Sequence, residues 1–288
     1  MDTMTLDYTE HHCRAADGLT LYCRDYPGPR TSPPMAVVCL PGLTRNCRDF
    51  EALARRLAVR WRVITPDLRG RGRSDRDPDW SHYQPQVYAT DVLGLIDALH
   101  PGPVALVGTS LGGLVGMLIA AARPGRLAGL VLNDIGPEVA PEGVARIRSY
   151  VGQNAAVRDW DEAVAQTRLS YGVAYPDFDD AQWQAFTRLG YREDAQGIPQ
   201  PDYDPEIRRA AQGDSAALSL WPLFPALAAT PMLVVRGEHS DILAPATLER
   251  MQADHPRLQS VTIAQRGHAP TLDEPGSVEA IESFLAGL

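Results

Sequence analysis

Short apolar runs and amphipathic stretches alternate along most of the chain. The run at 35–40 carries no charge and suits a strand that is buried on both faces. The stretch at 49–58 spaces its apolar residues as one face of a helix does. The same reasoning predicts strands at 61–66, 104–107, 128–134, 231–237 and 258–264, and helices at 85–99, 245–255 and 276–288. This alternation predicts an α/β fold with a mostly parallel central sheet that helices cover on both faces.

Two regions depart from this alternation. Residues 11–26 read as two strands joined at Asp17-Gly18, a dipeptide typical of hairpin turns. Between 137 and 222 helical stretches occur without a clear buried strand, and aromatic residues concentrate there. We therefore expect an α/β core built from 1–136 and 223–288, with 137–222 inserted as a helical cap, or lid.

Composition narrows the classes of protein that the chain can represent. It has 288 residues, of which 44% are hydrophobic and 22% charged, and its formal net charge is −9. Such an acidic surface does not favour nucleic acid or an anionic membrane. The first residues have no basic region followed by an apolar one, and the four cysteines form no CxxC pair. We expect a reduced, cytoplasmic protein, and its oligomeric state stays open.

The uncharged run "VALVGTSLGGLVGMLIAA" is long enough to suggest a membrane helix, but a Gly-rich turn interrupts it. We expect a strand at 104–107, a sharp turn at 108–113 and a buried helix over 114–122. Within the turn, Gly108 and Gly112 stand two positions on either side of Ser110. A Gly-x-Ser-x-Gly turn between a strand and a helix exposes its serine as a nucleophile. Ser110 is therefore the candidate nucleophile.

A serine nucleophile needs a base, and the base needs an acid to orient it. His268 follows the last predicted strand, where loops at the carboxyl ends of parallel strands form ligand sites. Two acids compete. Asp241 follows the strand at 231–237 and keeps the chain order Ser, Asp, His, whereas Asp134 ends the strand at 128–134. We expect Asp241 to be the acid and Asp134 to accept backbone N–H bonds in a turn.

The chain resembles the α/β-hydrolase superfamily over essentially its whole length. The resemblance rests on "GTSLGG" at 108–113, "PDLRGRGRSD" at 66–75, "RGEHSDILAP" at 236–245 and "RGHAP" at 266–270. It implies Ser110 as nucleophile, Asp241 as acid and His268 as base. It also implies an oxyanion hole formed by the backbone N–H groups of Leu43 and Leu111.

The loop after the strand at 35–40 departs from the family, which usually has His-Gly there. Here the dipeptide is Pro41-Gly42. Proline has no N–H, but the expected donor is Leu43, so the oxyanion hole should survive. The arginines of "PDLRGRGRSD" do not form a phosphate site, because no Gly-rich loop with lysine accompanies them.

These features predict a serine hydrolase that cleaves a carboxylic ester of a small or medium-sized molecule through an acyl-enzyme. The alternatives are a lactonase, a carbon–carbon bond hydrolase of ring-fission products, and a ligand receptor on a hydrolase scaffold. Dehalogenases and epoxide hydrolases of this fold place an aspartate where Ser110 stands. Neither a metal nor an organic cofactor is required by this chemistry.

Overall fold

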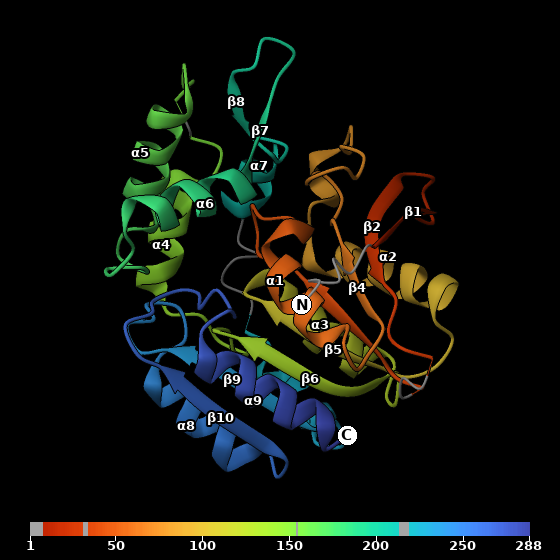
Figure 1. The fold of residues 1–288 in the computed structure, drawn as a ribbon. Coiled ribbons are helices and arrows are strands. Elements are labelled where there is room, and N and C mark those ends of the chain that lie inside the picture. Colours follow the sequence, from red (N-terminus) through yellow and green to blue (C-terminus); the bar gives the residue numbers. More distant parts are fainter. Residues whose placement is uncertain (1–7, 31–33, 154, 213–218) are drawn as a thin grey trace, which may run out of the picture.

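A computed structural model describes residues 8–30, 34–153, 155–212 and 219–288, and an eight-stranded sheet forms its centre (Figure 1). The strands of this sheet are β1 (Thr9–Arg14), β2 (Thr20–Tyr26), β3 (Ala36–Leu40), β4 (Val63–Pro66), β5 (Val104–Thr109), β6 (Leu127–Asn133), β9 (Met232–Gly237) and β10 (Leu258–Ile263). Their spatial order is β1-β2-β4-β3-β5-β6-β9-β10. β2 pairs antiparallel with β1 and β4, and every other pairing is parallel. The prediction of a mostly parallel sheet is confirmed.

Helices cover both faces of the sheet, as predicted. They are α1 (Glu51–Leu57), α2 (Pro85–Leu99), α3 (Leu111–Ala122), α8 (Pro245–Asp254) and α9 (Pro275–Ala286). Alternate side chains of β3 divide between the two faces, because successive residues of a strand point in opposite directions. Val37 and Cys39 pack with α1 and α9, whereas Val38 and Leu40 pack with α2, α3 and α8. These strand side chains are fully buried, which explains the uninterrupted apolar runs in the sequence.

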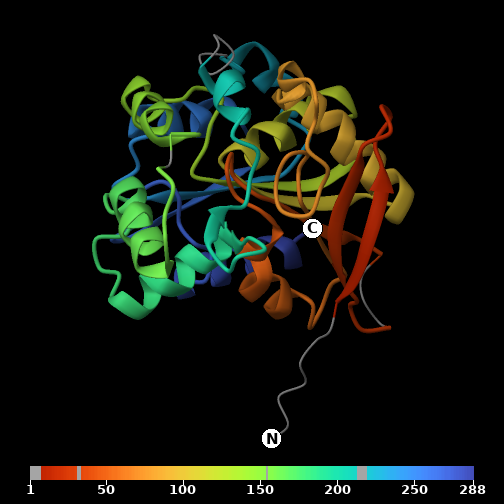
Figure 2. The ribbon, with the colours of Figure 1, turned by 90° about the horizontal axis from the view of Figure 1, so that it is seen from above.

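We call the residues between β6 and β9 the inserted segment. The elements formed by its described residues are α4 (Pro141–Tyr150), α5 (Trp160–Tyr171), α6 (Asp180–Gly190), β7 (Tyr191–Glu193), β8 (Pro199–Pro201), α7 (Ile207–Gln212) and the 3-10 helix η4 (Trp221–Leu227). Helices α4, α5 and α6 lie together on one side of the molecule, and the β1–β2 hairpin stands at the opposite end (Figures 1 and 2). None of the described residues of this segment joins the large sheet.

The inserted segment differs from the sequence prediction in one detail. β7 and β8 pair with each other as a small antiparallel hairpin. Each strand has only three residues, and β8 reads Pro-Gln-Pro, so no alternating pattern could reveal them. The division into core and cap at 136 and 222 stays a prediction, and residues 154 and 213–218 of the expected cap lie outside the described residues.

The uncharged run at 104–122 divides into β5 and α3 and lies in the interior of the fold. No helix in the described part of the chain has both the length and the apolar character that crossing a membrane requires. The four cysteines, Cys13, Cys23, Cys39 and Cys47, are free thiols.

Candidate active site

Ser110 occupies the sharp turn between β5 and α3. Its backbone has φ 51° and ψ −112°, a conformation that non-glycine residues rarely adopt. The glycines around it are required by space: a Cβ at Gly108 would collide with the backbone of Gly112, and one at Gly112 would collide with the carbonyl of Leu40. α3 begins at Leu111, three residues earlier than predicted, because the turn is tighter than the Gly-rich sequence suggested. This is the geometry of a nucleophile elbow.

Ser110, His268 and Asp134 form a continuous chain of hydrogen bonds. His268 Nε2 lies 2.8 Å from Ser110 Oγ, and His268 Nδ1 lies 2.8 Å from Asp134 Oδ2. The imidazole is 8% exposed and Asp134 is fully buried. The ring therefore touches a hydroxyl with one nitrogen and a carboxylate with the other, which is the arrangement of a Ser-His-Asp triad.

Asp241, the acid expected from the sequence, is not the residue that the structure pairs with His268 Nδ1, which contacts Asp134 instead. The structure pairs Asp241 with Arg146 of α4, whose Nη2 donates to Asp241 Oδ1 at 2.8 Å. β6 lies between β5 and β9, so Asp134 follows the strand beside the one that Ser110 follows. Asp134 also has φ 55°, a left-handed turn, directly after β6. Position in the sheet and this turn bring its carboxylate to His268.

The loop after β9 contributes to the site through neighbours of Asp241. The backbone N–H of Gly237 donates to Asp134 Oδ1 at 2.8 Å, and Ser240 Oγ donates to Asp134 Oδ2 at 2.5 Å. Two donors thus satisfy the buried carboxylate besides the imidazole. The segment that carries Asp241 therefore holds the carboxylate of Asp134 in place.

The loop that carries His268 is attached to the sheet and to the inserted segment. Asn133 Nδ2 donates to the carbonyl of Pro270 at 2.8 Å. Tyr175 of the inserted segment donates its hydroxyl proton to the carbonyl of Ala269 at 2.7 Å, and Gly267 N–H donates to the carbonyl of Ala174 at 2.8 Å. The residues on either side of His268 are therefore held from two directions.

Leu43 and Leu111, the expected oxyanion donors, line the same cavity as Ser110. Leu111 is the first residue of α3, where N–H groups have no partner within the helix. Gly42 lies next to Ser110, since a Cβ at Gly42 would stand 3.9 Å from the Cβ of Ser110. No hydrogen bond among the described residues uses the N–H of Leu43 or of Leu111. Both N–H groups can therefore donate to a substrate oxygen.

Arg71 fixes the Leu43 loop, a role that the sequence analysis did not predict. Its Nε donates to the carbonyl of Leu43 at 2.9 Å, and its Nη1 donates to the hydroxyl of Tyr88 at 2.8 Å. The side chain is 1% exposed, and no carboxylate among the described residues pairs with it. A buried guanidinium without a counter-ion is unusual, and this one brings positive charge to the carbonyl of Leu43.

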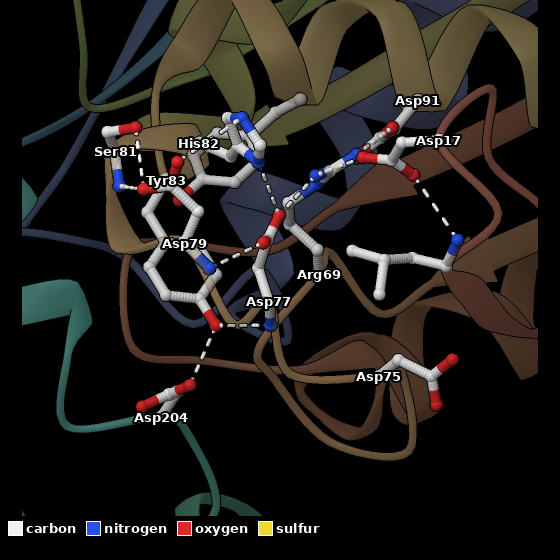
Figure 3. Close-up of polar contacts among 12 residues, drawn as sticks. Asp17, Arg69, Asp75, Asp77, Asp79, Ser81, His82, Tyr83, Asp91 and Asp204 are labelled. Carbon is white, nitrogen blue, oxygen red and sulfur yellow. Dashed lines mark hydrogen bonds and ion pairs between the residues drawn. The ribbon is translucent and has the colours of Figure 1, made fainter.

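Arg69, two residues earlier, has the opposite surroundings (Figure 3). It donates to Asp17, Asp77 and Asp91. Asp17 and Asp77, together with His82, are also close enough to share a metal ion. The guanidinium already supplies positive charge to both carboxylates at 2.7 and 2.6 Å, so this cluster is explained as the ion-pair network of Arg69.

Two cavities meet at Ser110 and Leu43. The larger has a volume of about 590 Å³ and is lined by His268, and by aromatic residues of the inserted segment. These residues are Tyr150, Tyr171, Tyr175, Phe178 and Phe186. The smaller has a volume of about 130 Å³ and is lined mostly by apolar side chains, with Leu111 at its wall. A substrate bound at Ser110 can extend in two directions.

Comparison with known proteins agrees with this geometry. The family model described as alpha/beta hydrolase fold matches residues 35–275, and the chain belongs to that family. The chain is 34% identical over 267 residues to a 3-hydroxybutyrate-oligomer hydrolase of Cupriavidus necator, covering 88% of this chain and 89% of the relative. It is 30% identical over 247 residues to a 2-(acetamidomethylene)succinate hydrolase of Mesorhizobium japonicum, covering 85% of each.

A solved structure is similar over the whole fold. It is an alpha/beta hydrolase from Novosphingobium aromaticivorans, with a TM-score of 0.91 and 45% sequence identity, covering 99% of this chain and 100% of that one. These relatives are hydrolases by name, and together with the family match they identify the class of protein as hydrolase.

Proposed function

We propose that the protein is a serine hydrolase that cleaves carboxylic esters through an acyl-enzyme. The observation that carries this proposal is the chain of two 2.8 Å contacts from Ser110 through His268 to Asp134, at a strained turn that opens onto two cavities. The name of the Cupriavidus necator relative describes action on an oligomer of a hydroxy acid, whose units are joined by ester bonds. That name supports an ester rather than another carbonyl substrate.

The reaction begins when Ser110 Oγ attacks the ester carbonyl carbon and His268 Nε2 takes the hydroxyl proton. The carbonyl oxygen becomes an oxyanion, and the N–H groups of Leu43 and Leu111 donate hydrogen bonds to it. Asp134 keeps the imidazole in the required tautomer and stabilises its positive charge. The carbon–oxygen bond of the ester then breaks, and His268 returns the proton to the departing alcohol.

Water completes the cycle. His268 takes a proton from a water molecule, whose oxygen attacks the acyl carbon, and the bond to Ser110 Oγ breaks as the serine regains a proton. The products are one alcohol and one carboxylic acid. Because Asp134 is buried and held by Gly237 and Ser240, it needs no rearrangement during these proton transfers.

Covalent labelling tests the nucleophile directly. A fluorophosphonate probe should label the wild-type protein stoichiometrically and leave Ser110→Ala unlabelled. Ser260→Ala, on the exposed surface of β10, is the matched control and should label as the wild type does. Turnover of a short-chain 4-nitrophenyl ester should follow the same pattern. Labelling of Ser110→Ala at the wild-type level, or hydrolysis of lactones without any ester hydrolysis, would contradict the proposal.

A further inference from the structure

We propose that the 130 Å³ pocket receives the acyl group and the 590 Å³ cavity receives the alcohol, so that the substrates are esters of short apolar acids with larger alcohols. The inference rests on the proposed function and assigns the two halves of its substrate to places in the fold. It follows from the positions of His268 and Leu111, which lie on different sides of Ser110.

The walls of the two cavities divide the catalytic groups between them. Both include Ser110 and Leu43, so the ester carbon is reached from either side. His268 lines only the larger cavity, and Leu111 lines only the smaller one. The base and one expected oxyanion donor therefore lie on opposite sides of the nucleophile.

The proton transfers assign the alcohol. In the first half of the reaction His268 Nε2 must protonate the oxygen that leaves with the alcohol. That oxygen must come within hydrogen-bond reach of the imidazole, which borders the larger cavity. The alcohol is therefore bound on the His268 side. The remaining substituent of the carbonyl carbon, the acyl chain, extends past Leu111 into the smaller pocket.

The size of the smaller pocket limits the acyl chain. A cavity of about 150 Å³ lined by aliphatic and aromatic side chains holds one benzene molecule. At about 130 Å³, this pocket holds an acyl chain of roughly four to six carbons.

The lining of the smaller pocket favours an apolar chain. Its aliphatic walls are Leu114, Ile135, Val139, Val144, Ile147 and Ile242. The Tyr83 hydroxyl is already bonded to Asp204, and the Tyr88 hydroxyl to Arg71. Gln84 and Arg148 also line the pocket, and Arg148 Nε donates to the carbonyl of Ala211.

The larger cavity tolerates a more polar group. Its arginines are neutralised by carboxylates: Arg45 by Asp49, and Arg266 by Asp177 and Glu274. The aromatic side chains beside them offer flat apolar surfaces. An alcohol with a ring or several polar atoms can therefore bind there without burying an unpaired charge.

Two series of esters test this assignment. One keeps 4-nitrophenol as the alcohol and lengthens the acyl chain from acetyl to decanoyl, and the other keeps butyrate and enlarges the alcohol from methyl to 4-methylumbelliferyl. Val144→Phe, which reduces the smaller pocket, should lower kcat/KM for hexanoate relative to acetate by about 10-fold or more. Ala185→Phe, in the larger cavity, is the matched control and should change only the preference among alcohols.

The ratio of the kcat/KM values for two substrates of one variant does not depend on how much of that variant is folded. A change in acyl preference in Ala185→Phe with none in Val144→Phe would overturn the assignment while leaving the proposed function intact. A wild-type protein that cleaves no ester of either series would overturn the proposed function, and the assignment with it.

Discussion

Asp134 and Asp241 follow the neighbouring parallel strands β6 and β9, yet their surroundings differ. Asp134 is fully buried, and its carboxylate is bonded to His268, Gly237 and Ser240. The side chain of Asp241 is 31% exposed and pairs with Arg146 of the inserted segment. The same residue type at equivalent strand ends thus takes part in the candidate triad in one case and joins two parts of the fold in the other.

The difference shows that neighbouring groups, more than order along the chain, decide which carboxylate contacts His268. A buried carboxylate is tolerated only where donors satisfy its oxygens, and the last residue of β9 and the loop after it give those donors to Asp134. Asp241 has a different partner of opposite charge. Burial alone would raise the pKa of Asp241, but the hydrogen bonds and charge of Arg146 outweigh it and lower that pKa.

The comparison predicts its largest effect for Asp134→Asn. Asparagine cannot stabilise the imidazolium, and its amide favours the wrong tautomer of His268, so kcat should fall by about 10³–10⁴. Steady-state kinetics on a short-chain 4-nitrophenyl ester measures this effect, with thermal unfolding as the control for the fold. If Asp134→Asn stays within tenfold of the wild type, Asp134 is not the catalytic acid.

Ser240→Ala should have an intermediate effect. It removes one of the donors to Asp134 Oδ2 but keeps the carboxylate and its bonds to Gly237 and His268. Loss of a hydrogen bond to a charged group costs about 1.5–3 kcal/mol, which corresponds to roughly 10- to 150-fold in kcat if it falls on the transition state. Ser240→Thr, which keeps the hydroxyl, is the control. Equal activities for the two variants would show that the hydroxyl does not support the acid.

Asp241→Asn should have the smallest effect on catalysis, with kcat within about threefold of the wild type. Its cost should appear in stability instead. The ion pair with Arg146 is partly exposed, so urea unfolding at neutral pH should show a loss of about 0–1 kcal/mol. A loss of kcat as large as that of Asp134→Asn would restore Asp241 as the acid.

The loss of stability in Asp241→Asn should depend on pH in a defined direction. Because folding lowers the pKa of Asp241, the wild type gains stability from this carboxylate above its ordinary pKa of 3.8 and loses that gain as pH falls through the lowered value. The stabilities of Asp241→Asn and the wild type should therefore differ most near neutrality and converge in acid. Paired urea titrations at pH 7 and near pH 3 provide the measurement, and a difference that grows in acid would contradict the prediction.

Much of the fold could be predicted because its signals are local. Apolar runs and amphipathic spacing gave most strands and helices of the sheet layers to within two residues of their observed ends. Ser110 was found because the glycines around it are a steric requirement of the elbow, and His268 because it follows the last strand. Local sequence patterns are therefore sufficient to predict these features.

The acid could not be chosen in the same way. Strand order in the sheet is a long-range property, and it places β6 rather than β9 next to the strand of Ser110. The left-handed turn at Asp134 could not be predicted, because no glycine occupies that position. The two cavities also escaped prediction, because their walls combine residues of β-strand loops, α3 and the inserted segment. Such sites depend on contacts between distant residues.

Ala174 and Tyr175 are hydrogen-bonded to the residues around His268, so the inserted segment is energetically coupled to the loop that carries this imidazole. A molecule that binds the segment more tightly while these bonds are intact also raises the population of proteins whose imidazole faces Ser110. Linkage makes this reciprocal: whatever fixes the imidazole in place strengthens binding under the segment by the same factor. Binding of a molecule under the inserted segment and the orientation of His268 would thus be coupled through these bonds.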